Sequence, residues 1–400
     1  MARPELSEVL GQEPAGDQFV DRARALIPSL RARGPEADRL RRIPQETIDD
    51  LLDCGLLQMM APKAFGGSEC DLASFFDVGV ALAEGDASTS WLFGILATHH
   101  WLLAHFPLEA QREVFSGRGY ALFPLTASGA GGTARRVPGG VVVNGHWSFA
   151  TGIDFAEWVG GIAAVEGGEP GETLNVLMAA DEVQVVDAWF VAGMRGTGSR
   201  DFIAKDVFVP DHRTLPQRDL MRGRTPGAAA HPDFSGLKTP LHIVLLLATA
   251  GVTFGLTRRA IEEFIDYTRS RDGYGGIDHK ARPSTQIRVA RALSRHAAYH
   301  DRVRALFARF DAQIAQGEKP TIEQRLECRR DIALGAQECA DIVNDIVSAA
   351  GARGQSESSV FQQLQRDINT VRTHVILDAE DACEAYGKHM LGVELGPVRL

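Results

Sequence analysis

The chain has 400 residues, with 42 Lys and Arg against 52 Asp and Glu, which gives a formal net charge of −10 at neutral pH. Its 44% apolar and 24% charged residues are typical of a soluble globular protein and exclude a disordered chain or a collagen. No run of Lys and Arg exceeds two residues, so the acidic balance argues against nucleic acid as the main partner. We therefore expect a small-molecule substrate.

The five cysteines form no CxxC pair and are odd in number, so neither a disulfide framework nor a zinc site is indicated. Residues 1–16 are polar rather than a charged start followed by an apolar run, which argues against a secretory signal and favours a reducing cytoplasm. The longest apolar stretch, residues 241–255, is short and contains polar residues. We expect it to be a buried helix and not a membrane span.

Residues 1–117 are predicted to form an N-terminal helical domain. Apolar residues recur at helical spacing from Phe19 to Leu30, and a second apolar pattern runs from Trp91 to His105 before Pro107. The composition changes at about residue 118, so we place the end of the first domain at residue 117.

Residues 118–212 are predicted to form a middle β-domain. They hold 16 of the 41 glycines and contain short apolar runs such as residues 141–143 and 207–209. Turn dipeptides between these runs favour an antiparallel sandwich or barrel over βαβ units. These dipeptides are Gly139-Gly140, Asn144-Gly145 and Gly167-Gly168.

Residues 213–400 are predicted to form a C-terminal four-helix bundle, after a linker at 213–237. Between residues 284 and 391 the only proline is Pro320, and apolar stripes recur at helical spacing. We expect four antiparallel helices. Their ranges are about 238–270, 287–314, 332–347 and 361–377.

His296 and His300 stand four residues apart on a predicted helix, which is a metal-compatible spacing. No acidic base or third ligand accompanies them in the sequence, so we expect a packed pair and assign no metal. The sequence also has no P-loop and no GxSxG motif.

Three segments in different parts of the chain combine aromatic residues or histidine with glycine or small hydroxyl residues. One of them is an apolar helical pattern interrupted by histidines, which are costly to bury unless they are hydrogen-bonded. The segments are residues 91–107, residues 144–154 together with 193–201, and residues 365–374.

Together with the order of helical, β and helical regions, these segments resemble the acyl-CoA dehydrogenase superfamily, and more closely its group D flavin-dependent monooxygenases. That branch combines a W-x-F-x-S-G segment, a G-x-x-G-T-G-S-x-D segment, a histidine in the helix before the β-domain and a histidine after an R-D pair. All four occur here, at residues 147–152, 193–201, His99 and, after Arg366-Asp367, His374. The resemblance covers nearly the whole chain and implies an α+β fold of the acyl-CoA dehydrogenase type.

Four residues of the first motif are implied to contact the flavin. Thr151 replaces the family's serine, which approaches the flavin N5 atom, and the backbone of Gly152 is expected near N5 and O4. Trp147 and Phe149 are expected to wall the pocket and exclude water from it.

The resemblance also implies the catalytic residues. His99 is the expected base toward a phenol, while His374 and Thr151 are expected to support a flavin C4a-hydroperoxide. Asp378 follows His374 by four residues, so we expect both on one helical face, with the carboxylate orienting the imidazole ring.

Two arginines are candidates for the flavin phosphate, because a guanidinium donates two hydrogen bonds in a fixed fork. Arg271 lies in a segment that resembles the superfamily stretch whose arginine reaches the phosphate, often across a subunit interface, and Arg353 is a second candidate. The apolar stripes of the bundle and this shared site predict a homotetramer.

The favoured function is the oxygenase component of a two-component flavin monooxygenase, which hydroxylates a small aromatic or phenolic substrate with O₂; a polyketide-like compound is one candidate. FMN is the expected cofactor, with FAD as the alternative. It would arrive as FMNH₂ from a separate NAD(P)H-dependent reductase, because the sequence has no nicotinamide-binding fold of its own.

Three alternatives remain open on the sequence. An N-hydroxylase acting on an amine or an amino sugar shares the same scaffold. An acyl-CoA dehydrogenase needs a carboxylate base above N5, and the segment from Gln355 to Phe361 lacks the usual glutamate motif, although Glu357 lies within it. A catalytically dead helical scaffold or flavin carrier is the alternative outside the enzymes.

Overall fold

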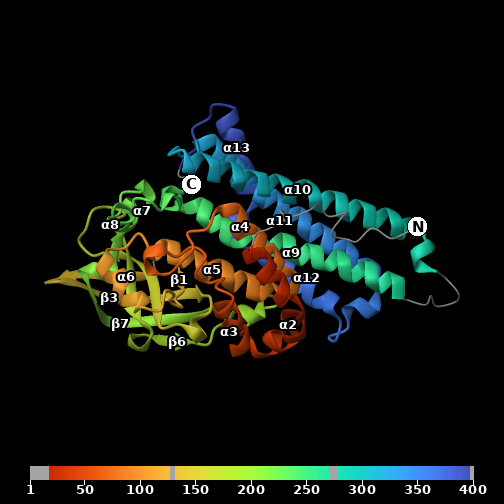
Figure 1. Ribbon diagram of the computed structural model, residues 1–400, viewed down its shortest axis with the longest axis horizontal. Helices are drawn as coiled ribbons and strands as arrows, with labels where there is room; N and C mark the ends of the chain where they lie inside the picture. Colours follow the sequence, from red (N-terminus) through yellow and green to blue (C-terminus); the bar gives the residue numbers. More distant parts are fainter. Residues whose placement is uncertain (1–17, 127–130, 271–277, 397–400) are drawn as a thin grey trace.

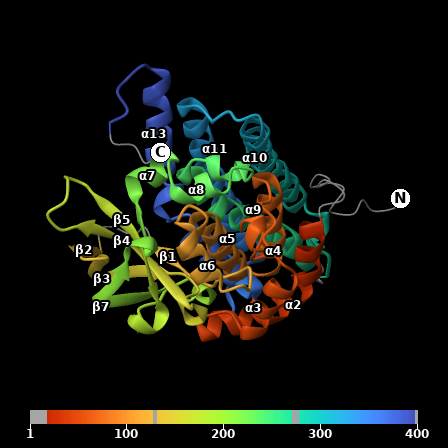
Figure 2. The same cartoon turned by 60° about the vertical axis from the view of Figure 1, so that its left-hand side comes forward.

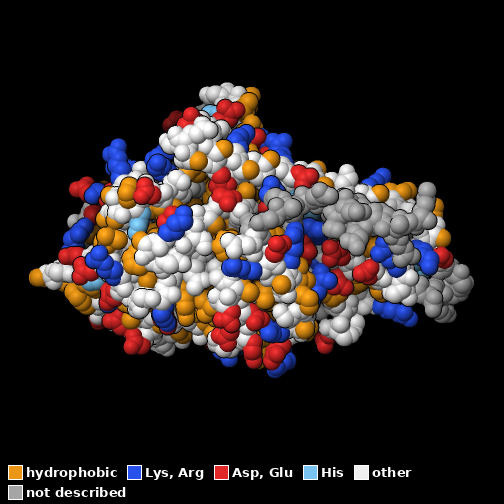
Figure 3. All heavy atoms as spheres, viewed as in Figure 1, with side chains coloured by type: hydrophobic (Ala, Val, Ile, Leu, Met, Phe, Trp, Pro, Cys, Tyr) orange, Lys and Arg blue, Asp and Glu red, His pale blue; other side chains and the backbone are white. Residues whose placement is uncertain are grey.

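The computed structural model describes residues 18–126, 131–270 and 278–396 (Figure 1). Helices at the start of the chain pack between a β-sheet and a group of long C-terminal helices, as both ribbon views show (Figures 1 and 2). Acidic and basic side chains are interspersed over the face drawn in Figure 3. The N-terminal helices are α2 (Gln18–Leu40), α3 (Gln45–Asp53), α4 (Leu72–Gly85), α5 (Ala87–Leu103) and α6 (Leu108–Phe115).

Helices α4 and α5 meet at Asp86, which ends the first and begins the second. Its carboxylate accepts hydrogen bonds from the Thr89 backbone N–H at 2.8 Å and from the Thr89 hydroxyl at 2.7 Å. These bonds satisfy one of the free donors at the start of α5, which explains why the helix begins here although Asp86 is buried. The start of α5 is thereby fixed at Asp86.

The middle domain is one mixed sheet in the order β6-β7-β3-β2-β4-β5-β8, with β1 beside β4. The predicted antiparallel arrangement is therefore only partly correct, because β4 pairs in parallel with both β1 and β2. After β3 the chain crosses through residues 151–157 and returns beside β2 instead of turning back along β3. The strands are β1 (Leu125–Thr126), β2 (Gly132–Val137), β3 (Gly140–Ala150), β4 (Trp158–Val165), β5 (Thr173–Ala179), β6 (Gln184–Val186), β7 (Arg200–Pro210) and β8 (Thr214–Pro216).

Two of the three predicted glycine turns occur, between β2 and β3 and between β4 and β5. The Asn144-Gly145 dipeptide instead lies inside β3, where the register with β7 shifts between Val143 and Gly145. The Asn144 side chain bonds the Asp206 backbone N–H at 2.8 Å and the Asp206 carboxylate at 3.0 Å across the two strands. This pairing stabilises a β-bulge at a position where sequence alone predicts a turn.

The C-terminal domain contains three long helices of 29 to 33 residues, α9, α10 and α11, whereas the predicted fourth helix, α12, has only 12 residues, so the four-helix prediction is only partly correct. Helix α9 contains the apolar segment that was expected to be a buried core helix. It is long and apolar enough to cross a membrane, yet 89% of its most apolar 18-residue stretch is buried inside the structure, which confirms the prediction. The C-terminal helices are α7 (Gln217–Arg222), α8 (Pro226–Ala230), α9 (Leu241–Ser270), α10 (Pro283–Ala315), α11 (Ile322–Ala350), α12 (Val360–Val371) and α13 (Ala379–Met390).

The fourth predicted helix, at residues 361–377, is shorter than expected. Helix α12 stops at Val371, so His374 lies outside it. Asp378 caps α13: its carboxylate accepts hydrogen bonds from the Glu380 and Asp381 backbone N–H groups at 3.0 and 3.1 Å. A cap at this position favours starting a new helix over continuing the old one. The expectation that Asp378 orients the ring of His374 is therefore wrong.

Candidate active site

One face of α5 is not fully covered by the rest of the described chain. Trp91 and Ile95 are partly exposed, while Thr98, His99 and Leu102 keep between 4% and 7% of their surface exposed. These five positions recur at helical spacing and so lie along one side of the helix. We call them the α5 face.

His99 occupies this face as a neutral side chain. Its Nδ1 lies 2.8 Å from the Phe123 carbonyl oxygen and 3.2 Å from the Leu125 backbone nitrogen. Burial lowers the pKa of His99 to about 4. The shorter contact favours Nδ1–H as donor to Phe123, which leaves the lone pair on Nε2. Among the described residues no partner is assigned to Nε2, so that lone pair is available to accept a proton.

His100, the next residue, is structural. Its Nδ1 lies 2.7 Å from the Leu57 carbonyl oxygen, and its Nε2 accepts from the Ala121 backbone N–H at 3.0 Å. Both ring nitrogens are thus occupied, and burial lowers the pKa of His100 to about 4. Helical periodicity does not separate these two histidines, because the backbone groups that bind them are distant along the chain; only the family resemblance singled out His99.

Thr151 and Gly152 reach α5 from the end of β3. A side chain at Gly152, whose φ is +75°, would lie 3.3 Å from Leu92 on α5, so the backbone approaches the helix closely. The Thr151 hydroxyl lies 2.8 Å from the Ser199 hydroxyl, and the Gly152 backbone N–H donates to the Thr197 carbonyl at 3.1 Å. Two motifs that are about 45 residues apart in the sequence therefore form one loop pair beside α5.

The two aromatic residues predicted to wall the flavin pocket have different environments. Trp147 is fully buried, stacks on Phe202 at 5.0 Å and donates its indole N–H to the Ile162 carbonyl at 3.0 Å. It belongs to the core of the sheet. The expectation that Trp147 walls the pocket is therefore wrong.

Phe149, in contrast, is 61% exposed and has a φ of +66°, which is uncommon for a residue with a bulky side chain. Its ring meets the edge of Trp189 at 6.2 Å. Arg41 holds the backbone at Trp189 in place. It donates to the Trp189 carbonyl at 3.2 Å and to both Asp187 carboxylate oxygens at 2.8 Å. Phe149 thus remains a candidate for contact with a planar ligand.

The segment at residues 365–374, most of which lies on α12, contacts the loop at residues 193–201. A side chain at Gly193 would lie only 2.1 Å from the Arg366 carbonyl oxygen, so the loop backbone rests directly on the helix. The Asp367 carboxylate accepts from the Met194 backbone N–H at 2.6 Å, and burial raises the pKa of Asp367 to about 7. Sequence reasoning quoted Asp367 only as part of a motif and missed this anchoring role, which a buried acid in an apolar stripe could have suggested.

His374 lies at the opposite end of the α5 face from His99. Its ring meets Trp91 edge-on at 5.3 Å, and its Nδ1 accepts from the Ile376 backbone N–H at 3.4 Å. The residue as a whole is exposed, yet desolvation of its ring lowers the pKa of His374 to about 4. Trp91 and His99 are eight residues apart, or about 12 Å along the helix, so a ligand would have to lie between the two histidines to contact both.

The structure does not bring Arg353 to this face. Arg353 is exposed in the short turn Ala352–Gln355 before α12, and α12 spans about 18 Å between that turn and the segment of His374. Glu357 is exposed in the same connection. Arg271 lies outside the described residues.

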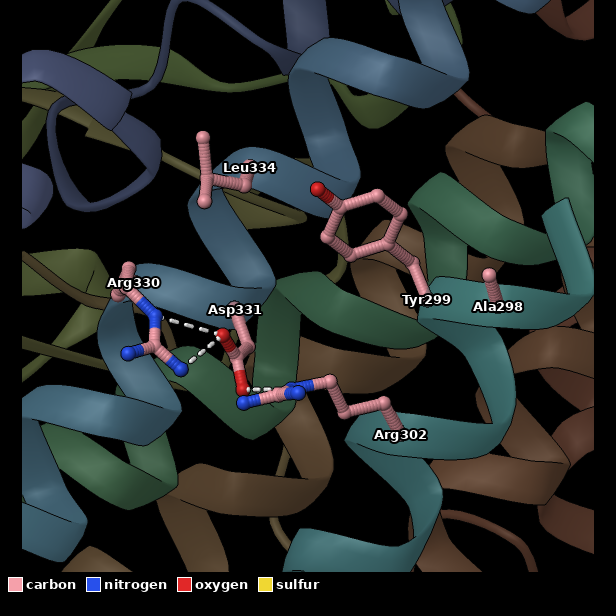
Figure 4. Close-up of a pocket in the computed structure, with 6 residues that line it drawn as sticks. All are labelled: Ala298, Tyr299, Arg302, Arg330, Asp331 and Leu334. Atoms are coloured by element: carbon pink, nitrogen blue, oxygen red, sulfur yellow. Dashed lines mark hydrogen bonds and ion pairs between the residues drawn. The ribbon is translucent and has the colours of Figure 1, made fainter. Parts of the chain in front are cut away.

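A hollow of about 540 Å³ lies elsewhere, between α10 and α11 (Figure 4). Its charged groups pair with one another: the guanidinium groups of Arg302 and Arg330 both bond Asp331, which sits between them (Figure 4). Arg330 also stacks on Tyr386 of α13 at 4.0 Å. None of these residues belongs to the α5 face.

Comparison with known proteins identifies the class to which this fold belongs. Residues 15–118 match the family model for the acyl-CoA dehydrogenase N-terminal domain, and residues 247–379 match that for an acyl-CoA dehydrogenase C-terminal domain. The crystal structure of 3-HSA hydroxylase from Rhodococcus sp. RHA1 superposes with a TM-score of 0.90 at 27% identity, over 95% of this chain and 98% of that one.

Two curated relatives narrow the class further. The oxygenase subunit HsaA of a flavin-dependent monooxygenase from Mycobacterium tuberculosis is 32% identical over 93% of this chain and 94% of its own length. The oxygenase component of an FADH₂-dependent resorcinol hydroxylase from Rhizobium sp. is 30% identical over 94% of this chain and 95% of its own. The chain belongs to the group D flavin-dependent monooxygenases of the acyl-CoA dehydrogenase superfamily, as the motifs predicted.

Proposed function

We propose that this chain is the oxygenase component of a two-component monooxygenase that hydroxylates a small phenolic substrate. In the overall reaction, one oxygen atom of O₂ enters the ring C–H bond, and the other leaves as water with the two electrons and two protons of the reduced flavin. The observations that support the proposal are that His99 lies on the α5 face, that His374 meets Trp91 of the same face at 5.3 Å, and that Gly152, next to Thr151, approaches Leu92 of α5. The relative named resorcinol hydroxylase supports a phenolic substrate.

The residues of this region fit a flavin. Thr151 offers a buried hydroxyl, Phe149 offers an exposed ring, and Gly152 lets the backbone come close. When bound as the reduced form, the flavin supplies the two electrons that activate O₂. We propose FMN as this cofactor, with FAD as the alternative, since one relative is named as FADH₂-dependent.

His99 would act as the base toward the substrate hydroxyl. A phenolate is the better nucleophile, and a neutral imidazole with a free Nε2 lone pair can take the phenol proton. Because burial lowers the pKa of His99 to about 4, the ring is neutral at pH 7 but a weak base, so the phenolate formed beside it would have to stabilise the protonated ring. His374 would support the oxygen-reactive side of the flavin from the other end of the α5 face.

Reduced flavin would come from a separate NAD(P)H-dependent reductase in the cytoplasm. We expect the purified chain to bind FMNH₂ under nitrogen and, on mixing with O₂ and a phenol such as resorcinol, to form hydroxylated product. NADH alone should not support turnover until a flavin reductase is added. Product formation from NADH without any reductase, or flavin-free protein that never binds FMNH₂, would refute the assignment.

We further propose a homotetramer in which a neighbouring chain completes the phosphate end of the flavin site with Arg353 or Arg271. Exposed apolar side chains on the bundle, including Ile287 on α10 and Leu391 after α13, support an assembly through these helices. Sedimentation should give four times the 43.3 kDa chain mass. Arg353→Ala should weaken FMN binding about 10-fold by removing a charged hydrogen-bond donor. A fully active monomer would contradict this assembly.

A further inference from the structure

Three buried hydroxyl groups form a chain that ends on a backbone carbonyl. Thr151 Oγ1 lies 2.8 Å from Ser199 Oγ, which lies 2.8 Å from Thr197 Oγ1, and Thr197 Oγ1 lies 3.0 Å from the Met194 carbonyl oxygen. Thr151, Thr197 and Ser199 are between 2% and 4% exposed. No further hydrogen-bond partner of these hydroxyls is assigned within the described residues.

The carbonyl end fixes the direction of all three hydrogen bonds. A carbonyl oxygen only accepts, so the Thr197 hydroxyl must donate its proton to Met194. The Ser199 hydroxyl must then donate to Thr197, and the Thr151 hydroxyl must donate to Ser199. With three protons and three bonds, no other arrangement keeps every bond, and leaving a buried polar group unpaired is costly.

Thr151 is therefore left as an acceptor only. Its proton is committed to Ser199, so its oxygen presents lone pairs to any ligand that lies against it. A reduced flavin carries a hydrogen on N5 and can donate to such an oxygen. An oxidised flavin carries a bare N5 lone pair, so two acceptors would face each other.

We propose that the Thr151–Ser199–Thr197 chain selects reduced over oxidised flavin by fixing Thr151 as a hydrogen-bond acceptor. This inference rests on the proposed function, since it concerns the flavin face of the same site. Thr197 and Ser199 act through Thr151 and are positioning residues. The selection lets a protein without its own reductase release spent flavin and take up reduced flavin.

The surrounding structure holds the end of the chain in place. Met194 has a φ of +57°, and its backbone N–H is bound to the buried Asp367 carboxylate at 2.6 Å. The Thr197 carbonyl is held by the Gly152 backbone N–H at 3.1 Å. Helix α12 thus anchors Met194, whose carbonyl sets the direction of the three hydroxyl hydrogen bonds. The loop that carries Thr197 is also bonded to Gly152, the residue next to Thr151.

The test is the affinity of full-length protein for oxidised and reduced FMN, measured by anaerobic titration. In Ser199→Ala the Thr151 proton loses its acceptor and can turn toward oxidised N5. We expect oxidised FMN to bind about 3- to 10-fold more tightly and reduced FMN to change less than 2-fold. Thr197→Val breaks the chain one bond further along and should shift the ratio in the same direction.

Ser148→Ala is the matched control, because Ser148 lies on the same strand but donates to Asp201 outside the chain, so the ratio should stay at the wild-type value. An unchanged ratio in both Ser199→Ala and Thr197→Val, with wild-type protein still binding FMNH₂ and hydroxylating, would overturn this inference alone. Equal weakening of both flavin forms would overturn it as well, since it would indicate general damage to the site. Wild-type protein without preference for FMNH₂ would overturn it together with the proposed function.

Discussion

Replacing His99 by Asn should lower product formation by about 10²- to 10⁴-fold while flavin oxidation by O₂ continues. The amide keeps a polar group near the Phe123 carbonyl but cannot take the phenol proton, so oxygen is reduced without reaching the substrate. The electrons should then appear as H₂O₂. The measurement is the ratio of hydroxylated product to O₂ consumed, with H₂O₂ assayed in the same reaction.

His374→Ala provides the contrast, because this ring lies at the other end of the α5 face against Trp91. We expect it to change the rate at which reduced flavin reacts with O₂ both with and without substrate, whereas His99→Asn changes only the fate of the oxygen. Stopped-flow mixing of FMNH₂-loaded protein with O₂ separates the two. Normal flavin oxidation and wild-type product yields in both variants would mean that the histidines are structural.

Replacing Gly193 by Ala should both destabilise the protein and weaken flavin binding. The added Cβ would lie 2.1 Å from the Arg366 carbonyl oxygen and 2.7 Å from the Asp367 backbone nitrogen, and backbone atoms cannot move aside cheaply. We expect a loss of about 1–3 kcal/mol in the free energy of unfolding. Because the shifted loop carries Thr197 and Ser199, FMNH₂ affinity should fall at least about 10-fold.

Gly387→Ala is the control for this effect, since no atom lies within 4 Å of a Cβ built at that position on α13. Alanine at this partly exposed position in the helix interior should leave stability unchanged or raise it by up to about 1 kcal/mol. Thermal unfolding and FMNH₂ titration of both variants give the comparison. A Gly193→Ala protein with wild-type stability and affinity would show that the contact between this loop and α12 does not support the site.

Local patterns were sufficient to predict the order of the domains and the membership of the family. Residues 241–255 carry enough apolar side chains to require burial wherever they lie, so the core helix α9 follows from composition. The motifs at residues 147–152 and 193–201 identified the monooxygenase branch, which the relatives confirm. These features depend on residues close together in the chain, and the sequence alone determined them.

Other features were decided only by contacts between distant segments. Trp147 and Phe149 stand two residues apart and would share one face of a regular strand. The shift in the β3–β7 register between Trp147 and Ala150, together with the positive φ of Phe149, leaves the first inside the sheet and the second exposed. The helical pattern that includes His374 is interrupted because Asp378 starts a new helix there. A period of 3.6 residues describes which side chains share a face, but it does not say where competing caps will end the helix.

The same reason separates the two adjacent histidines on α5. The Leu57 carbonyl and Ala121 backbone N–H occupy both nitrogens of His100, whereas His99 bonds the backbone at Phe123 through Nδ1 and keeps Nε2 available. The sequence determined that both rings lie in an apolar helix and must be hydrogen-bonded. Only the tertiary structure decided which of the two rings bonds the backbone through both nitrogens, because the backbone groups involved lie more than 20 residues away in the sequence.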